Sequence, residues 1–341
     1  MPIDAHLVAP LGHEDVAARE LAEIGFDGAF TFEGNHDAFF PLVAAARSGA
    51  DLDLMTNVAI ALVRSPLTLA YSAWDLQTLS RGRFRLGLGS QIKTHVERRY
   101  GARWESPLGQ MRECVEAIHA IFAAWQYGEK LDYRGTYTSH TLMTPTFDPG
   151  PNEYGPPPIL LGALGPKMTQ MVAEVADGLL THPFNSRRHL TERTLPAVDA
   201  GLAAAGRPAR GAADSRFELV LEAMVTCGRD EQELAAAAQA SRMRLAFYGS
   251  TPSYRPVLEA EGWEDLQPEL NRLSKLGQWQ QMGELIDDTM LRTLTVVGTP
   301  KECAAGIKER FGDVATRIAL SMSNAADRSL TGALLAAIRE S

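Results

Sequence analysis

The chain has 341 residues, of which 45% are hydrophobic and 22% are charged, and its formal net charge is −9 at pH 7. This composition supplies a core for one large α/β domain or two ordinary ones, and an acidic chain without basic blocks excludes the usual nucleic-acid-binding surface. No apolar run is long enough to span a bilayer and the N-terminus lacks the features of a signal peptide, so we expect a cytoplasmic protein with no membrane partner.

Strand-like apolar runs alternate with helix-like runs along the chain. Several strand candidates are apolar on both faces, as buried parallel strands are; they span 3–9, 28–32, 53–61, 83–90, 158–164, 178–184, 217–227 and 314–322. Runs with apolar residues at helical spacing span 14–24, 66–80, 107–126, 166–176 and 300–311. Pro66, Pro166 and Pro300 each stand at a plausible first helical position, where the missing N–H costs least.

About eight strand–helix units predict an α/β fold of the (β/α)8 TIM-barrel type, as one domain over residues 1–341. Two segments interrupt the alternation and are interpreted as insertions. Residues 128–156 are rich in Gly, Pro and Tyr and predict a hairpin or long loop, and residues 249–292 predict an irregular helical excursion. Long insertions in a barrel are usually lids or oligomer contacts, although surface decoration explains the second one equally well.

The segment GLGSQI at 87–92 contains two of the three glycines of a dinucleotide-binding loop. Ile92 stands where the third glycine belongs, and the segment lies in roughly the fourth strand rather than the first, so the sequence argues against a Rossmann site here. Two interpretations stay open. Gly87 and Gly89 either let a flat ligand lie against the backbone, with Ser90 and Gln91 as hydrogen-bonding groups, or they relieve crowding inside the barrel.

Four stretches in order resemble the bacterial-luciferase-like superfamily. They are GFDGAFTFEGNHDAFFPLVAAA (25–46), the unit from DLMTNVAIA to LSRGRFRLGLGSQ (53–91), PPPILLGALGPKMTQMVAEVADGLLTH (156–182) and DDTMLRTLTVVGTPKECAAGIKERFG (287–312). The resemblance covers most of the chain outside the two insertions. The acidic, two-insertion form is most similar to the branch that uses the deazaflavin coenzyme F420, while other members share the barrel and bind FMN.

This resemblance implies an enzyme that transfers a hydride between coenzyme F420 and a small organic substrate, with the ring doing the hydride chemistry. It also implies a homodimer. Two alternatives stay open: a monooxygenase that uses reduced FMN and oxygen, and a barrel that binds the cofactor without catalysis. No HExxH, GxSxG or Walker motif is present, and the three cysteines are far apart, so we expect no metal site.

The cofactor site follows from the resemblance and from one local pattern. The resemblance implies a non-proline cis peptide bond at Asn57–Val58, whereas the residues alone favour an ordinary trans bond. Glycines, a proline and a lysine at the start of the helix at 166–176 predict a site for the cofactor's phosphodiester, because helix N-termini attract anions. The predicted cofactor contacts are Thr56, Asn57, Val58, Gly87, Gly89, Ser90, Gln91, Gly162, Ala163, Leu164, Gly165, Pro166 and Lys167.

F420-dependent relatives often place an Asp–His pair just after the second strand. Here Glu33 falls at the acid position, Gly34 falls where the histidine belongs, and His36 follows two residues later. We take Glu33 and His36 as the candidate catalytic pair, since a histidine tuned by a neighbouring carboxylate exchanges protons near pH 7; helix capping is the alternative for His36. His6 is a candidate substrate contact and equally a structural residue.

Overall fold

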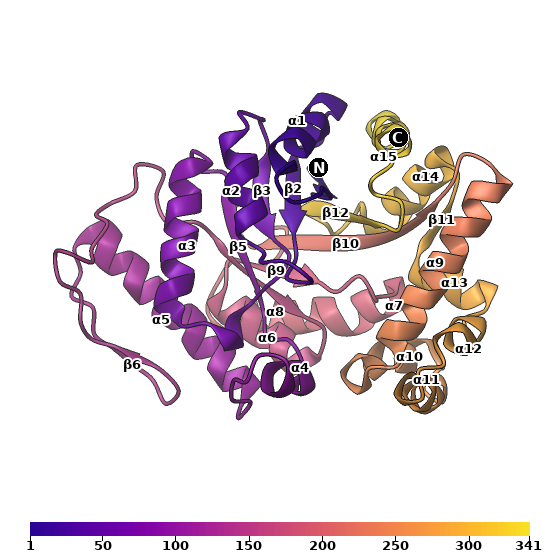
Figure 1. Ribbon diagram of the computed structural model, residues 1–341. Helices are drawn as coiled ribbons and strands as arrows, with labels where there is room; N and C mark the ends of the chain where they lie inside the picture. The colour runs from indigo at the N-terminus through magenta and orange to yellow at the C-terminus, as the bar shows by residue number, and fades with distance from the viewer.

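The computed structural model describes residues 1–341 and contains a closed barrel of parallel strands surrounded by helices (Figure 1). Each strand pairs with its neighbours around the barrel, and the last pairs with the first. In order the eight strands are β1 (Ile3–His6), β2 (Gly28–Thr31), β3 (Asp53–Thr56), β5 (Phe84–Gly89), β8 (Ile159–Ala163), β9 (Gly178–Thr181), β10 (Glu218–Cys227) and β12 (Arg317–Met322). The predicted (β/α)8 barrel is confirmed.

Helices cover the outside of this barrel. They include α1 (Glu14–Ile24), α2 (Phe40–Arg47), α3 (Pro66–Leu79), α5 (Pro107–Tyr127), α6 (Pro166–Val175), α8 (Leu195–Ala204), α14 (Pro300–Phe311) and α15 (Arg328–Glu340). Helices α1 and α14 have the bounds that the spacing predicts, and α3, α6 and α14 each begin at the predicted proline. A short helix, α7 (Arg187–His189), leads through a π-helical turn into α8.

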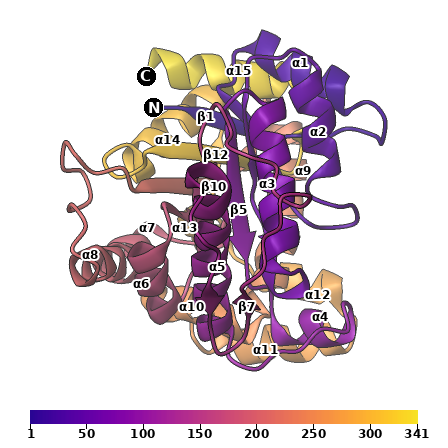
Figure 2. The same ribbon diagram turned by 90° about the vertical axis from the view of Figure 1, so that its left-hand side faces the viewer.

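Smaller elements lie at the barrel's ends. The segment 128–156 contains the hairpin of β6 (Tyr133–Arg134) and β7 (Ser139–His140). The short strands β4 (Ala59–Ile60) and β11 (Val296–Gly298) pair in parallel with β5 and β10. Between β10 and β11 lie the remaining helices: α9 (Glu231–Gly249), α10 (Arg255–Glu261), α11 (Leu266–Lys275), α12 (Trp279–Glu284) and α13 (Asp288–Leu294). Figures 1 and 2 show α10, α11 and α12 at the same end of the barrel as α4 (Lys93–Arg98).

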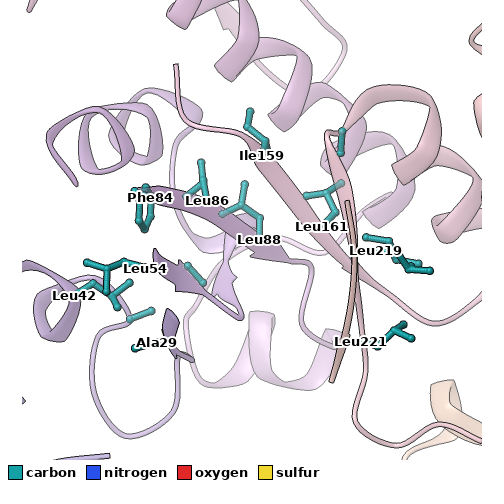
Figure 3. Close-up of a cluster of buried hydrophobic side chains, with 14 of the residues drawn as sticks. Ala29, Leu42, Leu54, Phe84, Leu86, Leu88, Ile159, Leu161, Leu219 and Leu221 are labelled. Carbon is teal, nitrogen blue, oxygen red and sulfur yellow. The ribbon is translucent and has the colours of Figure 1, made fainter. Parts of the chain in front are cut away.

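Alternation along the strands divides their side chains between two environments. One set points outward and packs against the helices in the main core; it includes Leu86 and Leu88 of β5 and Leu161 of β8 (Figure 3). The other set points into the barrel, where a separate apolar cluster fills the middle layer: Phe30, Met55, Leu160, Leu180, Val220 and Ala319. The barrel is therefore a packed core, as TIM barrels are.

The inward layer at the amino ends of the strands is charged. The Arg317 guanidinium donates to Asp4 Oδ1 at 2.5 Å and also to Asp53, while Arg85 contacts Asp53 at 3.0 Å and Glu218 at 3.0 Å. Arg317 and Asp4 have only 5% and 2% of their side-chain surface exposed. Each buried charge thus has an opposite partner, and the group closes the amino-terminal end of the barrel.

Removing Arg317 tests this layer. We expect Arg317→Leu to lower the free energy of unfolding by about 3–5 kcal/mol, because Asp4 would remain buried without a cation. Urea unfolding followed by circular dichroism measures the change. Arg188→Leu, which breaks an exposed pair with Glu192, is the control and should change stability little. Equal stability of Arg317→Leu and the wild type would contradict this role.

Candidate functional site

A bulge follows β3 at the carboxyl end of the barrel. The Asn57–Val58 peptide bond is cis, as the family resemblance implies and the residues alone do not. The Thr56 hydroxyl donates to the carbonyl of Gly87 at 2.7 Å and accepts from its N–H at 2.9 Å. The chain therefore joins β3 to β5 at this point through a side chain.

The glycines of β5 make room for this bulge. A Cβ added to Gly87 would lie 1.7 Å from the carbonyl oxygen of Thr56, and one added to Gly89 would lie 2.6 Å from Val58 Cγ2. A Cβ added to Gly162 of β8 would lie 3.3 Å from Cγ1 of the same valine. Packing against the bulge therefore explains the glycines at positions 87 and 89. Val58 itself is half-buried, packs on the inner apolar cluster and lies against the glycine positions of β5 and β8.

Glu33 holds the bulge from the opposite side. Its Oε2 accepts from the Ile60 N–H at 2.8 Å and from Arg64 Nη1 at 2.6 Å, and its Oε1 accepts from the Tyr100 hydroxyl at 2.9 Å. Its own N–H donates to the Val58 carbonyl at 3.0 Å. Both carboxylate oxygens therefore have partners within the protein.

His36 lies apart from Glu33 in this structure. It is exposed in the loop between β2 and α2, and it makes no hydrogen bond. Helix α2 begins at Phe40, and the carboxylate that accepts from its first N–H groups is that of Asp37. The structure therefore shows neither the helix-capping role nor a Glu33–His36 pair.

Polar side chains form the third inward layer, at the carboxyl ends of the strands. Asn57 Nδ2 donates to Glu222 Oε2 of β10 at 3.1 Å across the barrel. The Glu222 N–H donates to Thr181 Oγ1 at 3.1 Å, and Ser321 of β12 accepts from Arg244 Nη1 of α9 at 3.2 Å. Burial raises the pKa of Glu222 to about 7, although Ser321, Arg244 and Asn57 partly offset that rise.

Two histidines belong to the same layer. The His6 ring packs 5.5 Å from the Phe30 ring and 4.9 Å from the Phe32 ring, and burial together with Arg244 and Arg328 lowers the pKa of His6 to about 4. Burial lowers the pKa of His182 to about 3. Both imidazoles are therefore neutral at pH 7.

His182 connects the barrel to the helices that follow β10. Its ring lies 4.7 Å from the ring of Tyr248 in α9 and 4.3 Å from that of Tyr254. The Phe184 N–H donates to His182 Nδ1 at 3.0 Å, which assigns the ring hydrogen to Nε2. The mouth thus has one aromatic wall that also carries a neutral N–H donor.

The predicted anion site lies at the start of α6. Gly165 is the N-cap residue, and no side chain caps the helix, so its first N–H groups lack side-chain partners. Lys167 is exposed in the first turn. In contrast, α14 also begins with Pro–Lys, but Thr299 and Glu302 form a capping box there. An anion can therefore approach the N–H groups of α6 more readily than those of α14.

The remaining predicted contacts border this region. Ala163 and Leu164 are half-buried beside Gly162 at the end of β8. The side chains of Ser90 and Gln91 both bond to neighbouring backbone groups. The Ser90 hydroxyl donates to the Gln91 carbonyl, and the Gln91 side chain accepts from the Ile92 N–H at 3.0 Å.

The sequence interpretation missed Glu222, Arg244, His182 and Ser321. A usable signal existed for Glu222, because a glutamate within the apolar strand run 217–227 is unusual for a buried position. Tyr248 and Tyr254 stand out in the sequence as aromatic residues that indicate either a hydrophobic substrate or packing of a lid, and the structure places both rings against His182. None of the helices has the length and apolar composition that crossing a bilayer requires.

Comparisons with known proteins place this geometry in context. A family model described as luciferase-like monooxygenase matches residues 8–317. The uncharacterized protein Rv1360 of Mycobacterium tuberculosis is 46% identical over 334 residues, covering 98% of this chain and 97% of that protein. Rv3520c of the same organism, provisionally named a coenzyme F420-dependent oxidoreductase, is 30% identical, covering 85% and 84%. A solved structure, the coenzyme F420 dependent tetrahydromethanopterin reductase from Methanopyrus kandleri, has a TM-score of 0.78 at 19% identity, covering 97% and 96%.

Gly87→Ala tests the fit of the bulge against β5. Because the added Cβ would meet the Thr56 backbone, we expect a loss of at least about 1–3 kcal/mol in the free energy of unfolding. Gly165→Ala is the matched control, since a Cβ there meets nothing within 4 Å. Thermal and urea unfolding measure both variants. Similar stability of the two would show that β5 does not need glycine at position 87.

Proposed function

Because the chain belongs to the luciferase-like monooxygenase family, we propose that it is an oxidoreductase that transfers a hydride between coenzyme F420 and a small organic substrate. The 30% identity with a relative named for F420 supports this choice of cofactor. When bound, the deazaflavin ring supplies the hydride chemistry, and the protein positions the ring and the substrate. A homodimer and a cytoplasmic location stay predictions from the sequence.

The observation that carries the proposal is the glycine-lined surface around Val58. Gly89 and Gly162 leave this side chain without neighbouring Cβ atoms on either side, and it is half-exposed at the carboxyl end of the barrel. A flat ring fits such a surface, and active sites of TIM barrels lie at this end. Asn57 would hold the ring from the bulge, whereas Thr56, a predicted contact, is fully buried and together with Gly87 keeps the bulge in place.

The uncapped start of α6 supplies the second half of the proposed cofactor site. Its N–H groups and Lys167 would bind the phosphodiester of the cofactor, together with the glycine-rich backbone of residues 162–165 that leads into Pro166. Ser90 and Gln91 would border the ring from β5. The same surface and anion site also fit FMN.

An FMN-dependent monooxygenase is therefore the second candidate, and the description of the matching family model favours it. Such an enzyme would use reduced FMN and oxygen, whereas a deazaflavin lacks the ring nitrogen through which reduced flavins activate oxygen. A barrel that binds cofactor without catalysis is a third possibility from another class. Proton transfer by His36 with Glu33, and a substrate contact at His6, stay hypotheses from the sequence.

Titrating the purified chain with F420 and separately with FMN tests the choice of cofactor. We expect saturable F420 binding at micromolar concentration, followed by cofactor fluorescence, and FMN affinity at least about tenfold weaker. The reverse order would identify the monooxygenase and call for a search for a partner reductase. If neither F420 nor FMN binds at micromolar concentration, the proposal is refuted.

Lys167→Ala tests the anion site. Loss of one cation at a helix N-terminus is expected to weaken F420 binding about two- to fivefold, and less at high salt because the interaction is screened. Lys301→Ala is the matched control, because Lys301 follows the first proline of a capped helix. Equal affinities of the two variants at low salt would remove Lys167 from the cofactor site.

A further inference from the structure

We infer that Glu222 carries the proton that accompanies hydride transfer at the mouth of this barrel, and that Asn57 positions it. The inference rests on the proposed function and deepens it. It assigns to β10 a role that the sequence interpretation gave to the loop after β2.

The position of Glu222 is the first observation. It is the only carboxylate among the inward-facing residues at the carboxyl ends of the eight barrel strands: His6, Phe32, Asn57, Gly89, Gly162, His182, Glu222 and Ser321. Its side chain is half-buried, so it still reaches the mouth.

Its attachments are the second observation. The Thr181 hydroxyl accepts from the Glu222 N–H, and Asn57 Nδ2 donates to Oε2 at 3.1 Å. The Ser321 hydroxyl gives this carboxyl group a second side-chain hydrogen bond. Asn57 is also the first residue of the bulge beside the proposed ring surface. The carboxyl group is therefore held next to the proposed ring surface by two hydrogen bonds, and because a carboxylate has about four acceptor positions it can still meet a ligand.

The charged and titratable groups around Glu222 leave it as the group able to exchange a proton near pH 7. His6 of β1 and His182, the residue after β9, are neutral because their pKa values are lowered to about 4 and about 3. In α9, burial and the neighbouring Glu222 raise the pKa of Tyr248 to about 12, and the Arg244 guanidinium donates to Ser321. Burial raises the pKa of Glu222 to about 7, between these groups.

The contrast with Glu33 supports the same assignment. Three donors from the Ile60 backbone, Arg64 and Tyr100 occupy both oxygens of Glu33, so that carboxylate is used to hold the bulge. If Glu33 took up a proton in each turnover, the protonated oxygen would give up one of these donors and the bulge would lose its support. Glu222 receives side-chain hydrogen bonds only from the neutral groups of Asn57 and Ser321, and no arginine forms an ion pair with it.

The step balances in either direction. During substrate oxidation, the Glu222 carboxylate would take the proton of the substrate O–H bond as the C=O bond forms, and the hydride of the adjacent C–H bond would leave to the deazaflavin when that cofactor is bound. During reduction of a carbonyl substrate, protonated Glu222 would give this proton to the substrate oxygen, and the hydride would come from the reduced cofactor. Two electrons move with the hydride, and no further oxidant is needed.

The test uses Glu222→Gln, in which the amide oxygen still accepts from Asn57 but no proton can be exchanged. The Glu222 carboxyl carbon is followed by ¹³C NMR between pH 4 and pH 9, and the signal is assigned by its absence in the variant. The reaction probe is a single turnover of protein-bound reduced F420 with 1,4-benzoquinone, which takes one hydride and one proton to form the hydroquinone.

We expect the carboxyl carbon to titrate near pH 7 and the wild-type rate to fall as the pH rises through that value, because the acid form supplies the proton. Glu222→Gln should retain F420 affinity within about threefold, react at least about tenfold more slowly at pH 6, and show a flat pH profile. Glu218→Gln, on the same strand and paired with Arg85, is the control; it should unfold at lower temperature but keep the wild-type pH profile.

Each other outcome decides a separate point. A carboxyl carbon that titrates near its ordinary value, or a Glu222→Gln variant with the wild-type rate and profile, would overturn the inference while F420 binding stands. A pH profile that becomes flat in His36→Ala instead would do the same and favour the hypothesis from the sequence. Failure to bind F420 would refute the proposed function, and the inference with it.

Discussion

The contact between the β3 bulge and β5 is the constraint on which the rest of this site depends. Thr56 exchanges two hydrogen bonds with the backbone of Gly87, and the bulge passes so close that no side chain fits at that position. Glu33 and Arg64 hold the bulge from the other side at 2.6 Å. The direction of the Asn57 side chain, and through it the position of Glu222, follows from this clamp.

The barrel interior holds charged side chains in two layers, one at each end of the strands, and their partners differ. At the amino ends, every carboxylate faces an arginine, so the charges are paired and the layer stabilises the closed barrel. An apolar layer follows, centred on Phe30, Leu180 and Val220. At the carboxyl ends, burial raises the pKa of Glu222 to about 7, and the side chains that bond to it are the neutral Asn57 and Ser321. Burial raises the pKa of Asp4 to about 7 as well, despite its contact with Arg317, so the two layers differ in their ion pairs and in their access to the mouth.

The helices inserted after β10 complete the mouth. They surround their own apolar cluster, which includes Met224 at the end of β10 and Phe184 after β9. This packing brings Tyr248 and Tyr254 against His182 and Arg244 against Ser321. The sequence interpretation placed the second irregular segment at 249–292, whereas α9 already begins at Glu231 and contributes both Arg244 and Tyr248. Helix α9 is rich in alanine, so its apolar face has little periodic contrast for a pattern to reveal.

The amino-acid sequence by itself determined the number and type of the barrel units. Short apolar runs marked all eight strands, and prolines marked the starts of α3, α6 and α14, because these signals act over a few neighbouring residues. The ordered motifs also indicated the family and the cis bond at Asn57–Val58. Only the tertiary structure decided which polar groups meet. Asn57 and Glu222 are 165 positions apart, and closure of the barrel brings them within 3.1 Å. The proton affinity of Glu222 depends on burial by several strands at once, which no local pattern encodes.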